Sequence, residues 1–299
     1  MAAITFTVFT PTYNRAHTLR NVYGSLLSQT YKNFEWLIVD DGSTDQTHEL
    51  VQSFKSEKIL NIRYFYQKNG GKHVAFNKGV LEAKGNLFLT LDSDDQCIST
   101  ALERFYLNWI DIPEDRRKEF SGVTCLCKDE LGRIVGGKLP KPTLEGLPHE
   151  VTEKYRLSGE KWGFHKTDIL KIYPYPVFPK ERYIAESLVW NRIGRIYKIK
   201  FINEPLRLYI NSSDGLSRST TQLRQSSPNG TFLYYSEALL VASSSLDLIR
   251  VYSNLWRFAL HGKRAKKVLQ IGKKSLFSIF GFILGLSLYF LDCWRHRSQ

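Results

Sequence analysis

The first hundred residues alternate short apolar, β-rich runs with amphipathic helical patterns, and this alternation limits the possible folds more than any other feature. Strand patterns are predicted at residues 4–10, 34–39, 62–67 and 87–91, and helical patterns at 16–29, 44–54 and 73–83. Strands and helices alternating at this spacing are typical of a parallel, doubly wound sheet with flanking helices. We therefore expect an α/β fold with a mostly parallel sheet.

The rest of the chain is less regular. A further helix is predicted at 98–110, a strand at 122–127 and a return strand at 198–210. Residues 132–148 hold seven Gly and Pro residues, which predict a loop and short hairpin across the mouth of the sheet. Residues 216–261 are expected to be helical. The chain is thus divided into segments 1–110, 111–215 and 216–299.

The positive charge lies mainly at the C-terminal end. The net charge is +13, yet residues 246–299 alone carry ten Lys and Arg against two Asp. A nucleic-acid-binding module would spread basic and aromatic residues over its fold. We therefore expect no nucleic-acid partner.

The four cysteines and the N-terminus indicate a reducing compartment. Cys125 and Cys127 are two residues apart in an apolar run, and no second Cys/His pair has zinc-ligand spacing. The N-terminus lacks a signal-peptide pattern and enters a strand almost at once. Reduced thiols in a cytosolic chain are the expectation.

Polar motifs follow three of the predicted strands. They are Thr10–Arg15 (TPTYNR), Val39–Asp45 (VDDGSTD) and Leu91–Asp95 (LDSDD). Ligands of open α/β sheets bind beyond the carboxyl ends of the strands. Each motif alone has a structural alternative, since turns and helix caps use the same residue types. Their common position predicts one ligand site.

The third motif places three carboxylates within four residues. Asp92, Asp94 and Asp95 would repel one another unless a cation neutralised them. Carboxylate oxygens suit Mg²⁺ or Mn²⁺, and such a metal would hold a diphosphate. The alternative is a solvated acidic turn in which Asp94 and Asp95 cap the next helix.

These motifs, in this order, resemble glycosyltransferase family 2. Its members have a Pro-x-Tyr-Asn strand end, then Asp-Asp-Gly-Ser-x-Asp, then an Asp-x-Asp metal motif. Residues 69–79 (NGGKHVAFNKG) also resemble a family stretch, although Phe76 replaces its usual Arg and Lys72 is the candidate substitute. The resemblance is strong over 4–110 and moderate over 160–210. It implies a GT-A fold and an inverting transfer of sugar from a nucleotide diphosphate, with UDP as the expected nucleotide.

The resemblance also implies residue roles in donor binding. Thr10, Pro11 and Tyr13 would lie against the base. Asp41 would accept a hydrogen bond from the uracil N–H, and Arg15 would contribute a positive charge. The segment 1–110 would then be the donor half of the GT-A domain, and 111–215 the acceptor half.

The acidic motif would serve the diphosphate. Asp92 would contact the ribose or help position the metal, with Ser93 in the same turn. Asp94 would be the principal metal ligand, with Asp95 beside it. The metal and Lys72 would stabilise the departing nucleoside diphosphate.

The inverting reaction needs a base for the acceptor hydroxyl. The family's acidic pair corresponds here to Ala185 and Glu186, so Glu186 is the candidate base, followed by Glu181 and then Asp168. A first-turn Glu that stabilises a helix is the alternative. Trp162 is a candidate for stacking on an acceptor sugar, and core packing is its equal alternative.

Residues 275–291 contain no charge and are apolar on all sides of a helix. At 1.5 Å per residue the run is roughly 26 Å long, slightly short of a bilayer's hydrocarbon core. Basic residues flank it, which suits the anionic, cytoplasmic face of a membrane and a lipid-linked or glycan acceptor. We expect residues 263–297 to associate with the membrane, and a buried helix is the alternative. Gly281 and Gly285 form a Gly-x-x-x-Gly pair that suits a homodimer.

Two other interpretations stay open. A nucleotidyltransferase also uses an α/β sheet and metal-bound carboxylates, but residues 10–15 lack the glycines that grip a triphosphate. A degenerate, non-catalytic family member on the membrane is the second, because the acidic pair is incomplete.

Overall fold

The structure is a computed structural model that describes residues 4–210, 220–242, 244–271 and 276–297. The chain divides into two compact units. One comprises Met1–Pro174 and Arg192–Asp214, and the other Tyr175–Asn191 and Gly215–Gln299. Parts of the predicted helical stretch 216–261 and apolar run 275–291 lie outside the described residues.

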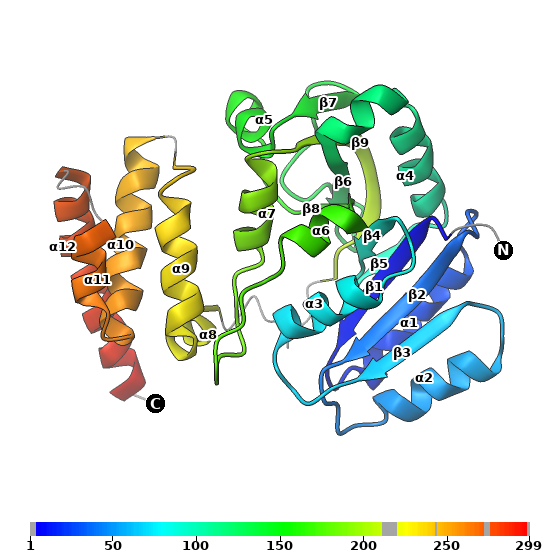
Figure 1. The fold of residues 1–299 in the computed structure, drawn as a ribbon, viewed down its shortest axis with the longest axis horizontal. Helices are drawn as coiled ribbons and strands as arrows, with labels where there is room; N and C mark the ends of the chain where they lie inside the picture. Colours follow the sequence, from blue (N-terminus) through cyan, green and yellow to red (C-terminus); the bar gives the residue numbers. More distant parts are fainter. Residues whose placement is uncertain (1–3, 211–219, 243, 272–275, 298–299) are drawn as a thin grey trace. The chain divides into compact units, whose positions relative to one another are not determined.

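The N-terminal half of the first unit contains four parallel strands in the order β3-β2-β1-β4. Helices connect them, as the strand–helix alternation predicted (Figure 1). The elements are β1 (Phe6–Thr12), α1 (Ala16–Leu27), β2 (Phe34–Asp40), α2 (Thr47–Ser56), β3 (Ile62–Tyr66), α3 (Lys72–Glu82) and β4 (Leu87–Thr90).

The second half of the sheet continues from β4 in the order β8-β6-β9-β5, with β7 also paired to β9. Its pairings are antiparallel except for β6 with β9. The elements are β5 (Gln96–Cys97), α4 (Ala101–Ile110), a 3-10 helix η1 (Glu114–Glu119), β6 (Phe120–Lys128), β7 (Thr143–Gly146), α5 (Pro148–Tyr155), β8 (Lys161–Lys166), α6 (Thr167–Ile172), α7 (Ser187–Gly194), which crosses into the second unit, and β9 (Lys198–Leu208).

The region predicted as a loop and short hairpin agrees with that prediction only in part, because Ile134 forms an isolated antiparallel bridge with the nearby Lys128. Within residues 132–148, the strand β7 pairs with the distant β9 rather than with a neighbour in sequence. The Gly and Pro residues located the loops correctly, but a long-range partner cannot be seen in a local pattern.

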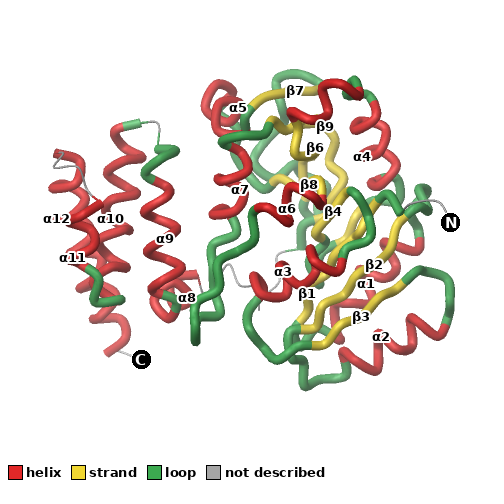
Figure 2. Tube along the Cα trace, viewed as in Figure 1, coloured by secondary structure: helices red, strands yellow, loops and turns green. Residues whose placement is uncertain are grey.

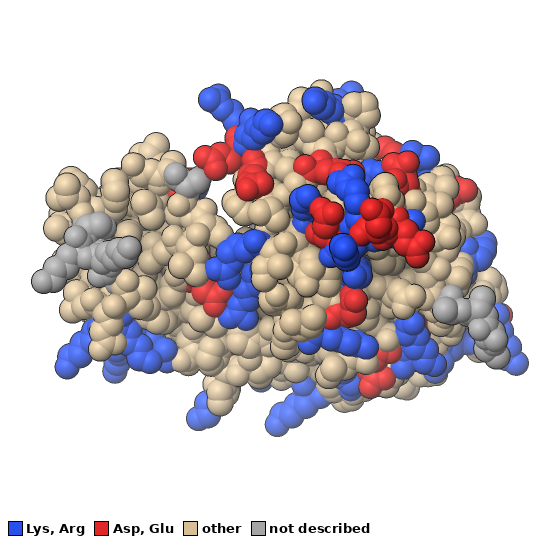
Figure 3. Space-filling view, turned by 45° about the horizontal axis from the view of Figure 1, so that its top comes forward, with Lys and Arg blue, Asp and Glu red and all other residues tan. Residues whose placement is uncertain are grey.

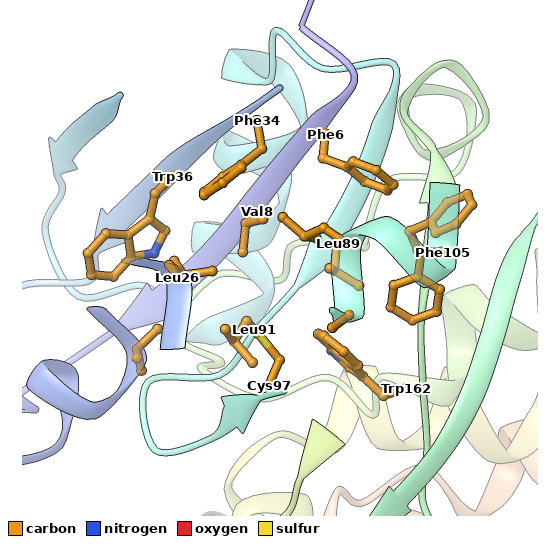
Figure 4. Close-up of a cluster of buried hydrophobic side chains, with 14 of the residues drawn as sticks. Phe6, Val8, Leu26, Phe34, Trp36, Leu89, Leu91, Cys97, Phe105 and Trp162 are labelled. Atoms are coloured by element: carbon orange, nitrogen blue, oxygen red, sulfur yellow. The ribbon is translucent and has the colours of Figure 1, made fainter. Parts of the chain in front are cut away.

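Helices cover both faces of the sheet, which confirms the doubly wound fold (Figure 2). On one face, side chains of α1, α2 and α4 pack with Phe6, Val8 and Trp36 in the main core (Figure 4). On the other face, Phe76 of α3 contacts the ring of Phe9, and Phe9 stacks on Phe88. Residues of β1 alternate between the faces, as the pleat requires.

The second unit is helical. Its helices are α8 (Thr220–Ser226), α9 (Pro228–Ala238), α10 (Ser245–His261), α11 (Ala265–Ile271) and α12 (Leu276–Arg297). Its core includes Tyr235 of α9, Leu255 and Trp256 of α10, and Val268 of α11, with Phe277 of α12 packed against them. The helix α12 is long and apolar enough to cross a membrane, which is a statement of length and composition only.

Candidate functional site at the carboxyl ends of the strands

The polar motifs lie together at one edge of the sheet. The backbone N–H of Asp41 donates to the carbonyl of Thr12, and that of Leu91 donates to the carbonyl of Phe9. The hydroxyl of Thr10 also donates to the carbonyl of Leu91 at 2.8 Å. Backbone and side-chain hydrogen bonds therefore join the ends of β1, β2 and β4, as their common position predicted.

The TPTYNR motif contains both structural and exposed residues. Thr10 is fully buried and accepts a hydrogen bond from the indole of Trp36 at 2.9 Å. Its hydroxyl is thus committed within the sheet, which argues against a contact with the base. Pro11 is also buried. Tyr13 is exposed beyond the strand, and Arg15 lies at the start of α1, where its N–H donates to Thr47.

Asn14 was not singled out from the sequence, yet it joins the first two motifs. Its backbone N–H donates to the Ser43 hydroxyl at 2.8 Å, and its side-chain oxygen accepts from the N–H of Thr44 at 2.8 Å. Asn14 also has a positive φ of 53°, a conformation that Asn tolerates better than most residues. An Asn at a strand-to-helix turn was the available signal.

The two acids of the second motif are buried and hydrogen-bonded. Asp40 accepts from the N–H of Ser43 and from the Tyr64 hydroxyl, both at 2.7 Å. Asp41 accepts from the Gln67 amide and from the N–H groups of Gly70 and Gly71. Asp41 therefore holds the loop before α3, and reading a uracil N–H would use its remaining lone pair. That role stays a prediction.

Lys72 and Asp92 form an ion pair at the mouth of the site. Lys72 Nζ lies 2.8 Å from Asp92 Oδ1, and the Asp92 side chain is 31% exposed. Desolvation opposes ionisation of Asp92, but the charges of Lys72 and Arg207 outweigh it and lower its pKa. In this arrangement Lys72 neutralises a carboxylate of the acidic motif.

Arg207 of β9 is the second cation at the acidic motif, and its place there was missed in the sequence. It is 8% exposed in its side chain, and its Nε lies 3.2 Å from Asp95 Oδ2. Its NH2 group lies 3.5 Å from a carboxylate oxygen of Glu160. Burial raises the pKa of Asp95, Arg207 opposes that rise, and Asp92 and Asp94 add to it, giving a value of about 7.

The donor atoms at this edge fit a hard divalent cation that a diphosphate helps to hold. Among the described residues, no group of three or more Asp, Glu, His or Cys side chains converges as a metal cage. Asp92 and Asp95 are paired with cations, and Asp94 is half-buried beside them. Mg²⁺ commonly uses one or two carboxylates plus substrate phosphates. The carboxylates of Asp94 and Asp95 are therefore of the type and number that such an ion would need from the protein.

Trp162 belongs to the core, which corrects the expectation that it stacks on an acceptor sugar. It is 4% exposed, and its ring packs edge-on against Phe105 with centroids 5.2 Å apart. Its indole N–H donates to the carbonyl of Thr90 at 2.6 Å. Strand β8, which carries Trp162, was not predicted, so its buried face could not be assigned.

Asp168 lies at the opposite edge of the sheet. Leu87, the first residue of β4, pairs with Lys166, two residues before Asp168, whereas the acidic motif follows the last residue of β4. A cavity of about 450 Å³ at that opposite edge is lined by Lys84, Lys166 and Asp168, among others. Strand direction therefore excludes Asp168 as a candidate base. It also shows that this cavity is not part of the donor site.

Glu181 and Glu186 both belong to the second unit. Glu181 is 7% exposed and accepts hydrogen bonds from the backbone N–H groups of Asn229 and Gly230. It stabilises the first turn of α9, so its oxygens are already used. Glu186 is exposed immediately before α7, and its role as base stays a prediction.

The comparison with protein families agrees with these motifs. Residues 7–115 match the model of glycosyl transferase family 2. This segment is similar to glycosyltransferase family 2. It ends before β6, so the matched residues contain the parallel strands and all three strand-end motifs.

Curated relatives match different shares of the chain. An uncharacterized glycosyltransferase of Rickettsia felis is 48% identical over 88 residues, which is 29% of this chain and 14% of that protein. An uncharacterized glycosyltransferase of Mycoplasma pneumoniae is 27% identical over 288 residues, covering 91% of this chain and 89% of that protein. The chain thus spans only a small part of the first relative and most of the second.

Solved structures share the fold along nearly the whole chain. Staphylococcus aureus TarS 1-349 in complex with UDP-GlcNAc has a TM-score of 0.62 and 21% identity, covering 95% of this chain and 80% of that one. The Pyrobaculum calidifontis mannosyltransferase PcManGT, in complex with GDP-Man and Mn²⁺, has a TM-score of 0.54 and 17% identity, covering 97% and 82%. At these identities the likeness shows the fold, and the predicted GT-A class is confirmed.

Proposed function

We propose that the chain transfers a sugar from a nucleotide diphosphate, with UDP as the nucleotide, to a hydroxyl of an acceptor glycan. The observation that carries the proposal is the Lys72–Asp92 ion pair at the end of β4, beside Asp94 and within the segment that matches family 2. A diphosphate would take over Lys72 as its partner, and its sugar would lie toward the acidic motif. The UDP-GlcNAc complex of TarS supports the choice of donor class.

The proposed reaction is a single displacement. The acceptor oxygen attacks the anomeric carbon, the bond from that carbon to the diphosphate oxygen breaks with its electron pair, and the configuration inverts. Lys72 stabilises the negative charge that develops on the leaving diphosphate. A bound Mg²⁺ or Mn²⁺ held by Asp94, with Asp95 beside it, would supply Lewis-acid stabilisation of the same charge. The Mn²⁺ in the PcManGT complex supports a divalent ion of this kind.

Glu186 is the proposed base that accepts the proton of the acceptor hydroxyl. It precedes α7 and is exposed, whereas both oxygens of Glu181 are held by the N-terminus of α9. Hydrogen bonds from backbone N–H groups make a carboxylate a poorer base. This contrast supports Glu186 over Glu181.

The acceptor is proposed to be a glycan or a lipid-linked glycan at the cytoplasmic face of a membrane. The support is the apolar helix α12 together with the basic residues that precede it. The Gly-x-x-x-Gly pair no longer supports the predicted homodimer, because Gly281 and Gly285 pack against α10 within the chain.

Isothermal titration of UDP with and without Mn²⁺ tests the donor site. Metal-dependent binding by the wild type, lost in Asp94→Ala and retained in Asp168→Ala, is the expected result. Asp168 is a matched carboxylate at the opposite sheet edge. Absence of nucleotide binding under every metal condition would instead identify a degenerate family member.

Product analysis tests the reaction class. Incubation with a UDP-sugar is expected to release UDP. Release of pyrophosphate from a nucleoside triphosphate and a sugar phosphate would instead identify a nucleotidyltransferase.

A further inference from the structure

The last helix, α12, has two faces of different character. Gly281, Gly285 and Asp292 recur at helical spacing on one face, and all three are buried. Leu276, Ile283 and Phe290 are seven residues apart on the other face, and they are 71%, 56% and 61% exposed. Residues spaced by seven lie nearly in line along a helix, so the exposed apolar stripe runs from residue 276 to residue 290.

Close contacts fix the glycine face to α10. A Cβ added at Gly281 would lie 2.3 Å from Tyr252 Cβ, and one at Gly285 would lie 2.5 Å from the carbonyl oxygen of Ser253. Farther along, the ring of Tyr289 lies 4.7 Å from that of His261. Later residues of α12 thus contact later residues of α10, so the two helices run parallel.

A buried charge network adds to this attachment. Arg257 Nε donates to Asp292 Oδ2 at 2.7 Å, and His261 Nε2 lies 3.0 Å from the same oxygen. The Asp292 side chain is 4% exposed. Moving α12 into hydrocarbon without α10 would leave a desolvated carboxylate without its partners, which is strongly unfavourable.

The exposed face of α12 is apolar and borders positive charge. Lys263, Lys266 and Lys267 are exposed on α11 or just before it. His261, the last residue of α10, contacts Tyr289 and Asp292, so Lys263 that follows it lies toward the later part of α12. Figure 3 shows a broad uncharged area on the helical unit with Lys and Arg gathered at its border. An apolar stripe beside lysines complements an anionic lipid surface.

We propose that α12 lies in the plane of an anionic membrane surface, docked through the stripe of Leu276, Ile283 and Phe290, while α10 covers its other face. A spanning helix would carry α10 with it, because the glycine contacts and Asp292 join the two. Arg257, close to the level of Gly285 near the middle of α12, would then enter the hydrocarbon. An in-plane helix leaves the Arg257–Asp292 pair on the protein side.

This inference rests on the membrane-linked acceptor of the proposed function. Its test measures lipid binding and does not depend on sugar transfer. The full chain is mixed with vesicles of phosphatidylcholine, with or without phosphatidylglycerol, and floated on a density gradient. Binding is expected only with the anionic lipid. The double variant Ile283→Glu/Phe290→Glu is expected to bind at least about tenfold more weakly. The matched control Leu131→Glu, an exposed leucine of the first unit, should bind like the wild type.

Depth measurements separate an in-plane helix from a spanning one. Fluorophores are attached to Leu276→Cys, Ile283→Cys and Phe290→Cys, each in a Cys293→Ser background, and quenched by lipids labelled at known depths. The other three cysteines are buried. Equal, shallow depths at all three sites are expected.

Three results would overturn the proposal. A depth that changes steadily from residue 276 to 290 would indicate a span. Unchanged vesicle binding by the double variant would remove the stripe from the interface. The third result has two parts: the wild-type chain does not bind vesicles and is a dimer, and the double variant is a monomer. That result would show that a second copy of the chain covers the stripe.

Discussion

Arg207 of β9 pairs with Asp95, which follows β4 more than a hundred residues earlier, at a distance of 3.2 Å. The pair is almost fully buried and lies beside Asp92 and Asp94. The acidic motif therefore receives part of its neutralisation from a strand in the other half of the sheet.

The first prediction concerns that pair. Arg207→Met is expected to lower the free energy of unfolding by about 3–5 kcal/mol, because it leaves a buried carboxyl among other acids. Adding Asp95→Asn should restore part of the loss, since the uncompensated group is then neutral. Urea denaturation of both variants measures the effect.

Arg104→Met is the matched control for this experiment. Arg104 pairs with Glu204 at 2.7 Å, but both side chains are about a third or more exposed. An exposed pair contributes about 0–1 kcal/mol. Equal losses in Arg207→Met and Arg104→Met would show that burial of the Asp95 pair is not decisive.

The second prediction concerns Lys72. Lys72→Met should weaken UDP binding by about tenfold to a hundredfold, because a charge-assisted contact to the diphosphate is lost. Titration calorimetry gives the affinity, and thermal unfolding verifies the fold. Lys68→Met, an exposed lysine four residues earlier, should bind UDP as the wild type does. Undiminished affinity in Lys72→Met would place the diphosphate elsewhere.

The third prediction separates the two glutamates. Glu181→Ala should destabilise the helical unit by about 1–3 kcal/mol, because the N–H groups of Asn229 and Gly230 lose their acceptor. Glu186→Gln should leave stability and UDP affinity unchanged while sugar transfer falls at least about a hundredfold. Unfolding curves and initial rates of UDP release distinguish the two. Full transfer activity in Glu186→Gln would exclude it as the base.

The fourth prediction concerns pH. Burial lowers the pKa of His165 to about 4, below its value of about 6.5 in an unfolded chain. The unfolded state therefore binds the proton first as pH falls, and up to about 3 kcal/mol of stability is lost between about pH 6.5 and pH 4. His165→Gln should flatten this dependence in urea unfolding series. His17→Gln, at an exposed position, should keep the wild-type slope.

The sequence predicted the parallel half of the sheet well because its signals are local. Each strand there is a short apolar run ended by a polar turn, and each connecting helix has its own periodicity. The strands β5 and β8 were missed for the opposite reason. The two residues of β5 pair with β9, and β8 pairs with β4 and β6, partners far along the chain.

The same distinction applies to the candidate site. The positions of Asp41, Lys72 and Asp92 at one sheet edge follow from strand direction alone. The burial of Trp162, the partnership of Arg207 and the helix-capping role of Glu181 depend on tertiary contacts. An aromatic residue or an acid in an unassigned segment fits a ligand site and a structural role equally well.

The pairing of β5 with β9 limits how this protein could be re-engineered by exchanging segments. The family match ends at residue 115, yet Gln96 pairs with Leu208, and Arg207 contacts the acidic motif. A chimera cut at the end of the matched region would inherit Asp95 without its partner Arg207. A transplant of the matched segment therefore has to carry residues 198–208 with it, although nothing in their sequence resembles a nucleotide-binding motif.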